Sequence, residues 1–357
     1  MKIALLSGAN SIHTTRWANA FALKGHEVHL ITQHLPGELL IPAVKVHLLS
    51  IKSKWGYFLN VFYLKYLLNQ IKPDILNAHY ASGYGTLARL SGFHPLVLSV
   101  WGSDVYDYPF ESKFNFWMVK KNLMHADMVC STSYAMADQT RKICPSLKDI
   151  RITPFGVDLK RFDRQSSVPE NEFVVGIVKT LEPKYGIEYL IKAFAVVKQK
   201  YQGNKKLKLM IAGKGSQLES LKSLAESLKI SEVVFMGYVP HIQVSKVFNQ
   251  FSVVVILSES ESFGVAAIEA SACELPVVVS NVGGLPEVIK DGRTGFVVPA
   301  KDPESAAVAI LKLIDDEGLC QSMGAEGRRL VVQEYDWDKN VDLMLGIFRE
   351  VSLASRH

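Results

Sequence analysis

The sequence predicts an α/β protein built from two doubly wound, Rossmann-like domains. A chain of 357 residues is too long for one ordinary core and suits two α/β domains. Short β-branched runs, such as residues 27–32 and 253–257, alternate with longer segments of helical pattern in both halves. A polar stretch, residues 163–172, separates the halves and is predicted to be the linker.

The composition argues against several classes of protein. Apolar residues make up 48% of the chain and charged residues 21%, as in ordinary globular proteins. The chain opens on an apolar strand without a signal-peptide pattern, and no apolar run is long enough to span a bilayer. The net charge of +5 suits an acidic nucleotide substrate or an anionic membrane surface and does not by itself indicate nucleic acid. Four cysteines lack disulfide or metal spacing, so free thiols in a reducing cytoplasm are expected: Cys130, Cys144, Cys273 and Cys320.

The first half opens as a βαβ unit. We expect a strand over residues 2–7, a helix over 14–24 with Thr14 or Thr15 as its N-cap, and a strand over 27–32. The G-x-G-x-x-G spacing is missing, and Gln33 and His34 stand where an acidic residue would bind a ribose. The sequence therefore argues against a nicotinamide dehydrogenase.

The second half is organised around residues 258–299. A strand over 253–257, a polar loop, a small-residue helix over 264–273 and a strand over 276–280 form one βαβ unit. The loop places the backbone N–H groups of Phe263, Gly264 and Val265 at a helix N-terminus, where they favour an anion. Two carboxylates, Glu261 and Glu269, frame this end and could accept hydrogen bonds from sugar hydroxyls. Taken alone, each glutamate could equally be a solvated helix residue.

Four motifs follow one another in this segment. They are Glu261 and Glu269 with seven residues between them, Pro276-Val277-Val278, Gly283-Gly284-Leu285-Pro286-Glu287, and Asp291-Gly292-Arg293-Thr294-Gly295-Phe296-Val297-Val298. In this order they resemble the nucleotide-sugar site of the retaining glycosyltransferases of family four, the glycosyl transferases group 1, which have the B-type glycosyltransferase fold. Weaker matches extend the resemblance over nearly the whole chain, among them Ala212-Gly213-Lys214-Gly215 and Gly237-Tyr238-Val239.

The resemblance implies a domain plan and an activity. It implies an acceptor domain over 1–165, a donor domain over 166–335 facing it across a cleft, and a C-terminal helix over 336–357 that returns to the first domain. The activity it implies is transfer of a hexose, with retention, from a nucleoside diphosphate sugar, UDP-linked by preference. The acceptor would be a saccharide or a lipid-linked glycan in envelope polysaccharide synthesis, lipopolysaccharide included. Neither a metal nor another cofactor is implied, and no nucleic acid. The expected location is the cytoplasm or the inner face of the membrane.

The resemblance also implies roles for individual residues. The loop with Lys179 and Lys184 matches the place of two family cations that face the diphosphate, although the family's glycine and arginine are absent there. The residues expected to be catalytic are Glu261, Lys179 and Lys184. Those expected to bind the donor are Glu269, Ser262, Phe263, Gly264, Val265, Gly213, Gly237, Val239 and Gly102.

The first half departs from the family pattern in two loops. Residues 9–17 lack the usual glycine pair, and they place His13 and Arg16 at the carboxyl edge of the sheet, where either could contact the donor or acceptor or simply face solvent. Trp101 stands before Gly102 where the family commonly has a histidine that reaches the hexose. Asp104 fits a helix cap better than a catalyst. His79, at another strand end, could supply an imidazole in place of the missing one.

Two aromatic and lysine-rich stretches stand out in the first half. Residues 52–72 and 110–121 combine exposed-type aromatics with flanking lysines, as interfacial helices do. Residues 52–72 could equally be a helix packed on its own sheet. We expect weak, salt-sensitive binding to anionic membranes if these side chains face outward.

Two other functions remain open. A sugar-nucleotide epimerase can have the same fold, and would interconvert sugars without releasing nucleoside diphosphate. A non-catalytic nucleotide-sugar-binding subunit would bind without turnover, and Trp101 in place of the histidine is the feature that favours it.

Overall fold

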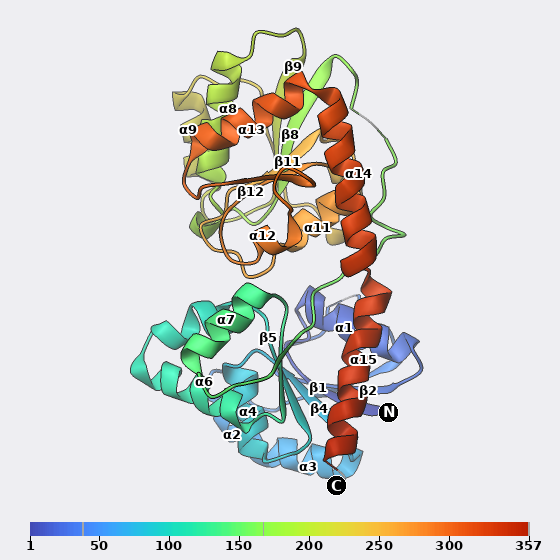
Figure 1. Cartoon of the computed structure of the whole chain (residues 1–357). Coiled ribbons are helices and arrows are strands. Elements are labelled where there is room, and N and C mark those ends of the chain that lie inside the picture. The colour runs from blue at the N-terminus through green and yellow to red at the C-terminus, as the bar shows by residue number, and fades with distance from the viewer. Residues whose placement is uncertain (38, 167, 356–357) are drawn as a thin grey trace. The chain divides into compact units, whose positions relative to one another are not determined.

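The computed structural model describes residues 1–37, 39–166 and 168–355 (Figure 1). The chain forms two compact units: Met1–Pro154 together with the helix from Lys339 onward, and Phe155–Asp338. Each unit is built on one parallel sheet with helices packed against it. The predicted fold class, two Rossmann-like α/β domains, is confirmed.

The first unit holds a seven-stranded sheet in the order β3-β2-β1-β4-β5-β6-β7. Its central strands are almost wholly buried and mainly apolar, as expected for a parallel sheet covered on both faces. The strands are β1 (Lys2–Leu6), β2 (Glu27–Thr32), β3 (Val44–Leu48), β4 (Ile75–His79), β5 (Leu96–Val100), β6 (Met128–Ser131) and β7 (Ile150–Ile152).

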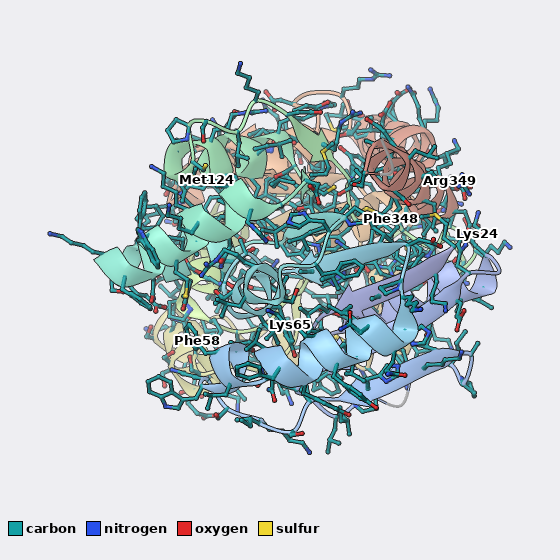
Figure 2. All side chains as sticks on the ribbon, turned by 90° about the horizontal axis from the view of Figure 1, so that it is seen from below. Lys24, Phe58, Lys65, Met124, Phe348 and Arg349 are labelled. Atoms are coloured by element: carbon teal, nitrogen blue, oxygen red, sulfur yellow. The ribbon has the colours of Figure 1, made fainter. Side chains whose placement is uncertain are left out.

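The helices of the first unit fall into two groups. One group contributes to a single apolar cluster with the sheet and consists of α3 (Val61–Ile71), α4 (Gly83–Ser91), α6 (Lys113–His125) and α7 (Tyr134–Ile143), preceded by the short elements α2 (Gly56–Leu59), α5 (Ser103–Tyr106) and η1 (Tyr108–Phe110). The other group is α1 (Ile12–Leu23) with α15 (Trp337–Ala354), whose Phe21 and Phe348 rings lie 5.4 Å apart. Figure 2 separates the groups: Lys24 and Phe348 are labelled on one side, and Phe58, Lys65 and Met124 on the other.

The second unit holds a six-stranded parallel sheet in the order β10-β9-β8-β11-β12-β13. The strands are β8 (Glu172–Val178), β9 (Lys206–Ala212), β10 (Val233–Gly237), β11 (Val253–Ile256), β12 (Val277–Ser280) and β13 (Gly295–Val298). The helical elements are η2 (Pro183–Tyr185), α8 (Ile187–Lys200), α9 (Leu218–Ser227), η3 (His241–Gln243), α10 (Val244–Phe248), α11 (Val265–Ala272), α12 (Leu285–Val288), α13 (Pro303–Asp315) and α14 (Glu317–Glu334).

The last helix belongs mainly to the first unit. From Lys339 onward α15 packs with α1, and Lys24 pairs with Asp342 at 2.8 Å. A second ion pair, Arg151 with Glu350 at 2.7 Å, fixes the helix near β7. The expected return of the C-terminal helix to the first domain is confirmed.

The segment after β7 packs with the second unit. Val157 donates its N–H to the carbonyl of Tyr335 at 2.8 Å and accepts from Trp337 at 3.0 Å, so two distant segments form a short bridge. The compact unit therefore begins at Phe155, ahead of the polar stretch that suggested the linker. Backbone pairing of this kind has no signature in a single sequence.

Two local predictions need correction. The first helix begins at Ile12 with Ser11 as its N-cap, because the Thr14 hydroxyl is buried and bonds Ser7 Oγ at 2.7 Å instead of capping. Strand β3 was not predicted, because its residues Lys45 and His47 are partly exposed and leave only a weak pattern. No helix in the described residues is both long and apolar enough to cross a membrane.

Candidate active site

The loop between β11 and α11 forms the centre of the candidate site. Gly264 ends this loop with φ of +106°, and a Cβ there would lie 2.9 Å from a Leu285 methyl group, so the position requires glycine. No described side chain caps α11, and its first N–H groups are free of intrahelical partners by geometry. The end of α11 can therefore take an anion.

Glu261 is held in this loop by backbone contacts. Its carbonyl accepts from the Gly284 N–H at 3.1 Å. Gly283 has φ of +50°, and a Cβ there would come within 1.7 Å of the Glu261 carbonyl oxygen. The Gly283-Gly284 pair after β12 has no side chains, so this loop can pack directly against the backbone of the loop that contains Glu261. The backbone of Glu261 is therefore tied to both loops, whereas its side chain is not fixed by these contacts.

Lys179 and Glu261 form a partly buried ion pair. Lys179 Nζ donates to Glu261 Oε2 at 2.5 Å, and the two side chains are 14% and 11% exposed. The Lys179 ammonium also lies 4.4 Å from the centre of the Tyr185 ring, a cation–π distance. Ser258 Oγ donates to the same carboxylate oxygen at 3.4 Å. The structure thus joins two residues that the sequence assigned to different parts of the donor.

Lys184 reaches the same loop through its backbone. Its carbonyl accepts the Glu259 N–H at 2.8 Å, which ties η2 to the residues before Glu261. Its ammonium lies 5.4 Å from the Tyr185 ring, on which Lys179 also sits. Tyr185 therefore brings two cations to one end of β8, a role that sequence analysis missed.

Glu269 lies on α11 and is only 5% exposed. His241 Nε2 lies 3.1 Å from Glu269 Oε1. Burial lowers the pKa of the Arg161 guanidinium, and the nearby Glu269 carboxylate opposes that shift. Glu269 is therefore a buried carboxylate facing an imidazole and a guanidinium, and neither His241 nor Arg161 was identified from the sequence.

A small cavity of about 230 Å³ adjoins Lys179. Gly213 and Val239, both expected to bind the donor, line it, and Gly213 donates its N–H to the Gly237 carbonyl at 2.7 Å. Lys214 Nζ lies 4.8 Å from the Tyr238 ring at the same cavity, and Tyr238 is 64% exposed. The cavity offers a flat aromatic surface beside strand-end backbone, which suits a nucleobase.

The other residues of the loop between β11 and α11 are either partly exposed at the site or buried beneath it. Ser262 and Val265 are partly exposed beside Gly264. Phe263 is buried, with its ring 5.7 Å from Tyr335 and 6.1 Å from Phe155. Its side chain anchors the loop, so only its backbone faces the end of α11.

In the first unit the candidates gather around Trp101. Trp101 is 8% exposed. The centre of its indole ring lies 4.0 Å from the ring centre of His79, 5.3 Å from that of Tyr80 and 6.1 Å from that of His13. Arg16 lies partly buried in the first turn of α1.

Asp104 supports this loop from beneath. Its carboxylate accepts the N–H groups of Ala81, Trp101 and Gly102, at 2.7, 3.1 and 2.8 Å. Burial raises the pKa of Asp104, and these backbone hydrogen bonds oppose the rise. Since the Gly102 N–H is already used by Asp104, this glycine can contribute only its small size to a sugar site.

His79 does not supply the missing imidazole. It is 1% exposed, with Nδ1 at 3.0 Å from Ser7 Oγ and Nε2 at 2.8 Å from Asn77 Oδ1. Desolvation, followed by repulsion from His13, lowers the pKa of His79 to about 3. The ring is a neutral core residue behind Trp101, so this hypothesis is wrong.

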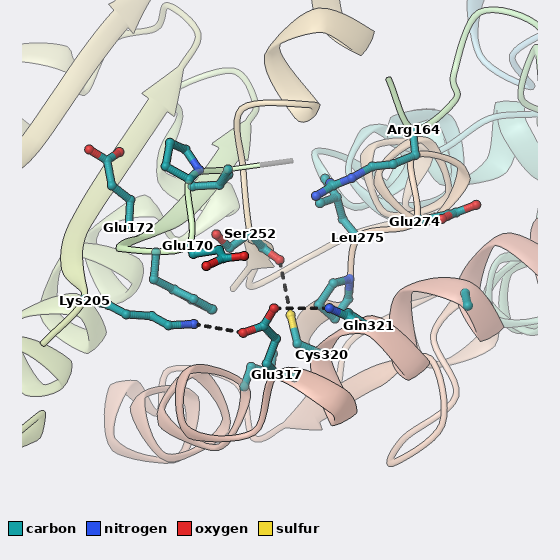
Figure 3. A pocket seen from close by; sticks show the side chains of 16 residues that line it. Arg164, Glu170, Glu172, Lys205, Ser252, Glu274, Leu275, Glu317, Cys320 and Gln321 are labelled. Carbon is teal, nitrogen blue, oxygen red and sulfur yellow. Dashed lines mark hydrogen bonds and ion pairs between the residues drawn. The ribbon is translucent and has the colours of Figure 1, made fainter. Parts of the chain in front are cut away.

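A second, larger cavity lies at the other end of the second sheet (Figure 3). Its volume is about 580 Å³, and it is lined by Glu172 at the start of β8 and Pro276 just before β12. Glu317 on α14 pairs with Lys205 at 3.6 Å and accepts from Gln321 at 3.2 Å, as Figure 3 shows. Open α/β sheets bind ligands at the carboxyl ends of their strands. We therefore do not assign this cavity to the active site. The described residues contain no cluster of three or more side chains that could hold a metal ion.

Comparison with known proteins decides the family. Residues 159–330 match the family described as glycosyl transferases group 1, and residues 2–133 match the family described as glycosyl transferase 4-like. The chain belongs to the glycosyl transferases group 1. It is a glycosyltransferase of this retaining family, and it transfers sugar from a nucleotide sugar.

Known proteins resemble this chain over much or nearly all of its length. N-acetyl-alpha-D-glucosaminyl L-malate synthase of Bacillus anthracis is 24% identical over 96% of this chain and 94% of its own. D-inositol 3-phosphate glycosyltransferase of Acidothermus cellulolyticus is 30% identical over 65% of this chain and 54% of its own. Sucrose-phosphate synthase of Thermosynechococcus elongatus superposes with a TM-score of 0.87 at 21% identity, covering 99% of this chain and 100% of that chain. HepE of Anabaena, in complex with UDP and glucose, gives 0.81 at 18% identity, covering 98% and 99%.

Proposed function

We propose that this glycosyltransferase moves a hexose from a UDP-sugar to a saccharide or lipid-linked glycan acceptor, with retention and without a metal. The observation that supports this most is the pair of Lys179 and Glu261 beside the uncapped end of α11. It combines a cation for the diphosphate, a carboxylate for sugar hydroxyls and backbone donors for phosphate oxygens.

Different residues of the site bind different parts of the nucleotide-sugar donor. The diphosphate lies at the N-terminus of α11, with Lys179 and Lys184 neutralising the charge that grows as it leaves. Glu269 accepts from the ribose hydroxyls, and the cavity of Gly213 and Val239 takes the base. Glu261 accepts from the hexose, which requires its ion pair with Lys179 to open or to be shared.

The reaction itself needs few protein groups. The bond between the anomeric carbon and the diphosphate oxygen breaks, and the acceptor oxygen bonds to the same face of that carbon. The acceptor proton passes to the departing phosphate oxygen, so atoms and charge balance. In this scheme the lysines and the helix end supply the stabilisation that a metal ion supplies elsewhere.

UDP is proposed as the nucleotide because HepE, a protein of the same fold, was solved with UDP and glucose and with UDP-glucose. An envelope glycan is proposed as the acceptor, and the cytoplasm or the inner membrane face as the place of the reaction. The free state of the four cysteines is consistent with a reducing compartment.

A screen of nucleotide sugars by thermal shift would test the proposal first. A ligand at 100 times its dissociation constant stabilises the folded state by about 2.7 kcal/mol, which is readily detected. The best donor is then incubated with saccharide acceptors, and nucleoside diphosphate release and the anomeric configuration of the product are measured. We expect UDP release and a product of retained configuration, and we expect transfer to be about 10- to 100-fold slower in Glu261→Gln.

The same assay separates the alternatives. Conversion of the nucleotide sugar into an epimer without UDP release would favour an epimerase. Tight donor binding without turnover on any acceptor would favour a binding subunit. Absence of binding by every UDP-sugar, with binding of another nucleotide, would contradict the choice of UDP.

A further inference from the structure

The first unit exposes large aromatic side chains on α2, α3 and α6. Phe62 on α3 is 81% exposed, Trp55 just before α2 is 72% exposed and Trp117 on α6 is 50% exposed. We call the whole set the aromatic face; its members are Trp55, Leu59, Phe62, Tyr66, Phe110, Phe114 and Trp117, all exposed.

These side chains are not needed by the core. Helix α3 buries Leu64, Leu67, Leu68 and Ile71, a complete apolar stripe, on its inner side. Helix α6 does the same with Met118, Val119 and Leu123. The sequence left open whether residues 52–72 pack on the sheet or face a membrane; the helix does pack, and it carries a second, outward set of aromatics as well.

The two segments lie on the same side of the sheet and adjoin. Helices α3 and α6 both contact α4, which lies between them in Figure 2. Tyr57 of α2 and Tyr108 of η1 both pack against the apolar cluster of the first sheet, and α2 and α6 both contact α4. Phe114 and Trp117 lie on α6, with their rings stacked at 6.1 Å. The aromatic face is therefore one surface made of two segments.

The same segments concentrate positive charge. Residues 52–72 and 110–124 contain seven lysines and one glutamate, a net charge of +6, whereas the whole chain carries +5. Most of these lysines are exposed, including Lys54, Lys65, Lys113 and Lys121. The remainder of the chain is thus close to neutral, and the cationic surface coincides with the aromatic one.

We propose that the aromatic face binds the surface of an anionic phospholipid bilayer. Exposed Trp, Tyr and Phe insert at the boundary between headgroups and acyl chains, and lysines around them bind anionic headgroups. Isolated apolar residues on a surface need no explanation, but a contiguous set ringed by lysines marks an interaction site. Net charge of one sign argues for an anionic bilayer rather than a second copy of this chain, whose matching face would repel it.

The position of this face suits a membrane-borne acceptor. The residues Tyr57 and Gly83 touch at the start of α4, which follows the carboxyl end of β4. The carboxyl ends of β4 and β5 carry His79 and Trp101, so the aromatic face borders the edge of the sheet expected to receive the acceptor. This use of the surface rests on the proposed function, whereas binding to the bilayer does not.

Vesicle sedimentation of the full chain tests the inference. The protein is centrifuged with phosphatidylcholine vesicles with and without phosphatidylglycerol, at about 0.1 M and about 1 M salt. We expect it to pellet only with the anionic vesicles and only at the lower salt. Lys65→Glu with Lys121→Glu should weaken partitioning by roughly 25-fold or more, because each lysine near an anionic surface contributes about fivefold. Trp55→Ser with Phe62→Ser should also release the protein.

Matched controls keep the test specific. Leu23→Ser with Leu353→Ser removes apolar side chains that are 77% and 58% exposed on α1 and α15, outside the aromatic face. Lys148→Glu with Lys160→Glu makes the same charge change at exposed loop positions. Both controls should pellet like the unaltered protein.

Two results would overturn the inference. One is equal recovery in the supernatant with and without phosphatidylglycerol. The other is anionic binding that either pair of aromatic-face substitutions leaves unchanged, or that the controls reduce equally. Calorimetry with UDP in the absence of vesicles reports on the donor site alone, so failure of the membrane inference and failure of the proposed function can be told apart.

Discussion

The ion pair between Lys179 and Glu261 leads to an unexpected prediction about nucleotide affinity. In this structure the ammonium is paired with a carboxylate 2.5 Å away, and both side chains are mostly buried. A diphosphate must compete with that carboxylate for the cation. Glu261→Gln keeps the shape of the side chain and removes its charge, so bare UDP should bind more tightly while transfer slows.

The size of both effects follows from the strength of charged hydrogen bonds. Such bonds contribute about 1.5–3 kcal/mol, and the glutamine oxygen still accepts from Lys179, so only part of that is released. We expect the affinity for UDP to rise by roughly 3- to 30-fold. The hexose loses a charged acceptor, so kcat/KM should fall by about 10- to 100-fold.

Calorimetry with UDP at constant pH and salt, together with a UDP-release assay, measures both. Glu259→Gln is the matched control: it lies in the same loop but bonds Tyr189 at 2.9 Å and Lys301 at 2.7 Å, and should leave UDP affinity within about twofold. A loss of UDP affinity in Glu261→Gln as large as the loss of turnover would refute the assignment of this residue to the hexose.

Three further predictions concern other groups. Glu269→Ala should weaken donor binding by about 1.5–3 kcal/mol in calorimetry, and unchanged affinity would remove the ribose assignment. Lys179→Ala should slow transfer by roughly a hundredfold or more, whereas a change below about threefold beside a large loss in Lys184→Ala would move the role to Lys184. Burial lowers the pKa of His79 to about 3, against 6.5 for an ordinary histidine, so below pH 6.5 the unfolded state takes up a proton that the folded state does not. Between pH 7 and pH 5 this should lower stability by about 2 kcal/mol, and His79→Gln should show a shallower decline in melting temperature; an equal decline would contradict it.

The sequence predicted the architecture because parallel strands are marked by their composition. The strand over 27–32 has the expected bounds, since five of its six residues are buried and most of these are apolar. Strand β3 was not predicted from the sequence, because its exposed face carries polar residues. The start of the second unit at Phe155 was not predicted either, because it depends on backbone pairing with residues near Asp336, which are distant in the sequence.

The candidate site was predicted as a set of residues but not as a set of contacts. Spacing alone placed Glu261 before α11 and Glu269 within it. It could not show that Lys179 would pair with Glu261, because that contact joins the ends of two strands through side-chain packing. His241 and Tyr185 have no local pattern either; only their distances to Glu269 and Lys179 reveal them.

The packing around Trp101 determines which polar groups of the first unit can reach a ligand. Trp101 fills the place of a family histidine, and its indole covers His79 so fully that no imidazole from beneath can reach a ligand. Asp104 accepts the N–H groups of Trp101 and Gly102, so these two backbone donors are not available to a sugar. His13 and Tyr80 are then the polar side chains that border the indole, and Tyr80 is held at φ of +69°, a conformation that non-glycine residues rarely adopt. Burial raises the pKa of Tyr80 to about 12, so its hydroxyl stays protonated at neutral pH and can donate to a sugar oxygen. We therefore expect the chemistry that the resemblance assigns to an imidazole to come from His13 or Tyr80 in the first unit, or from Glu261 and the lysines of the second.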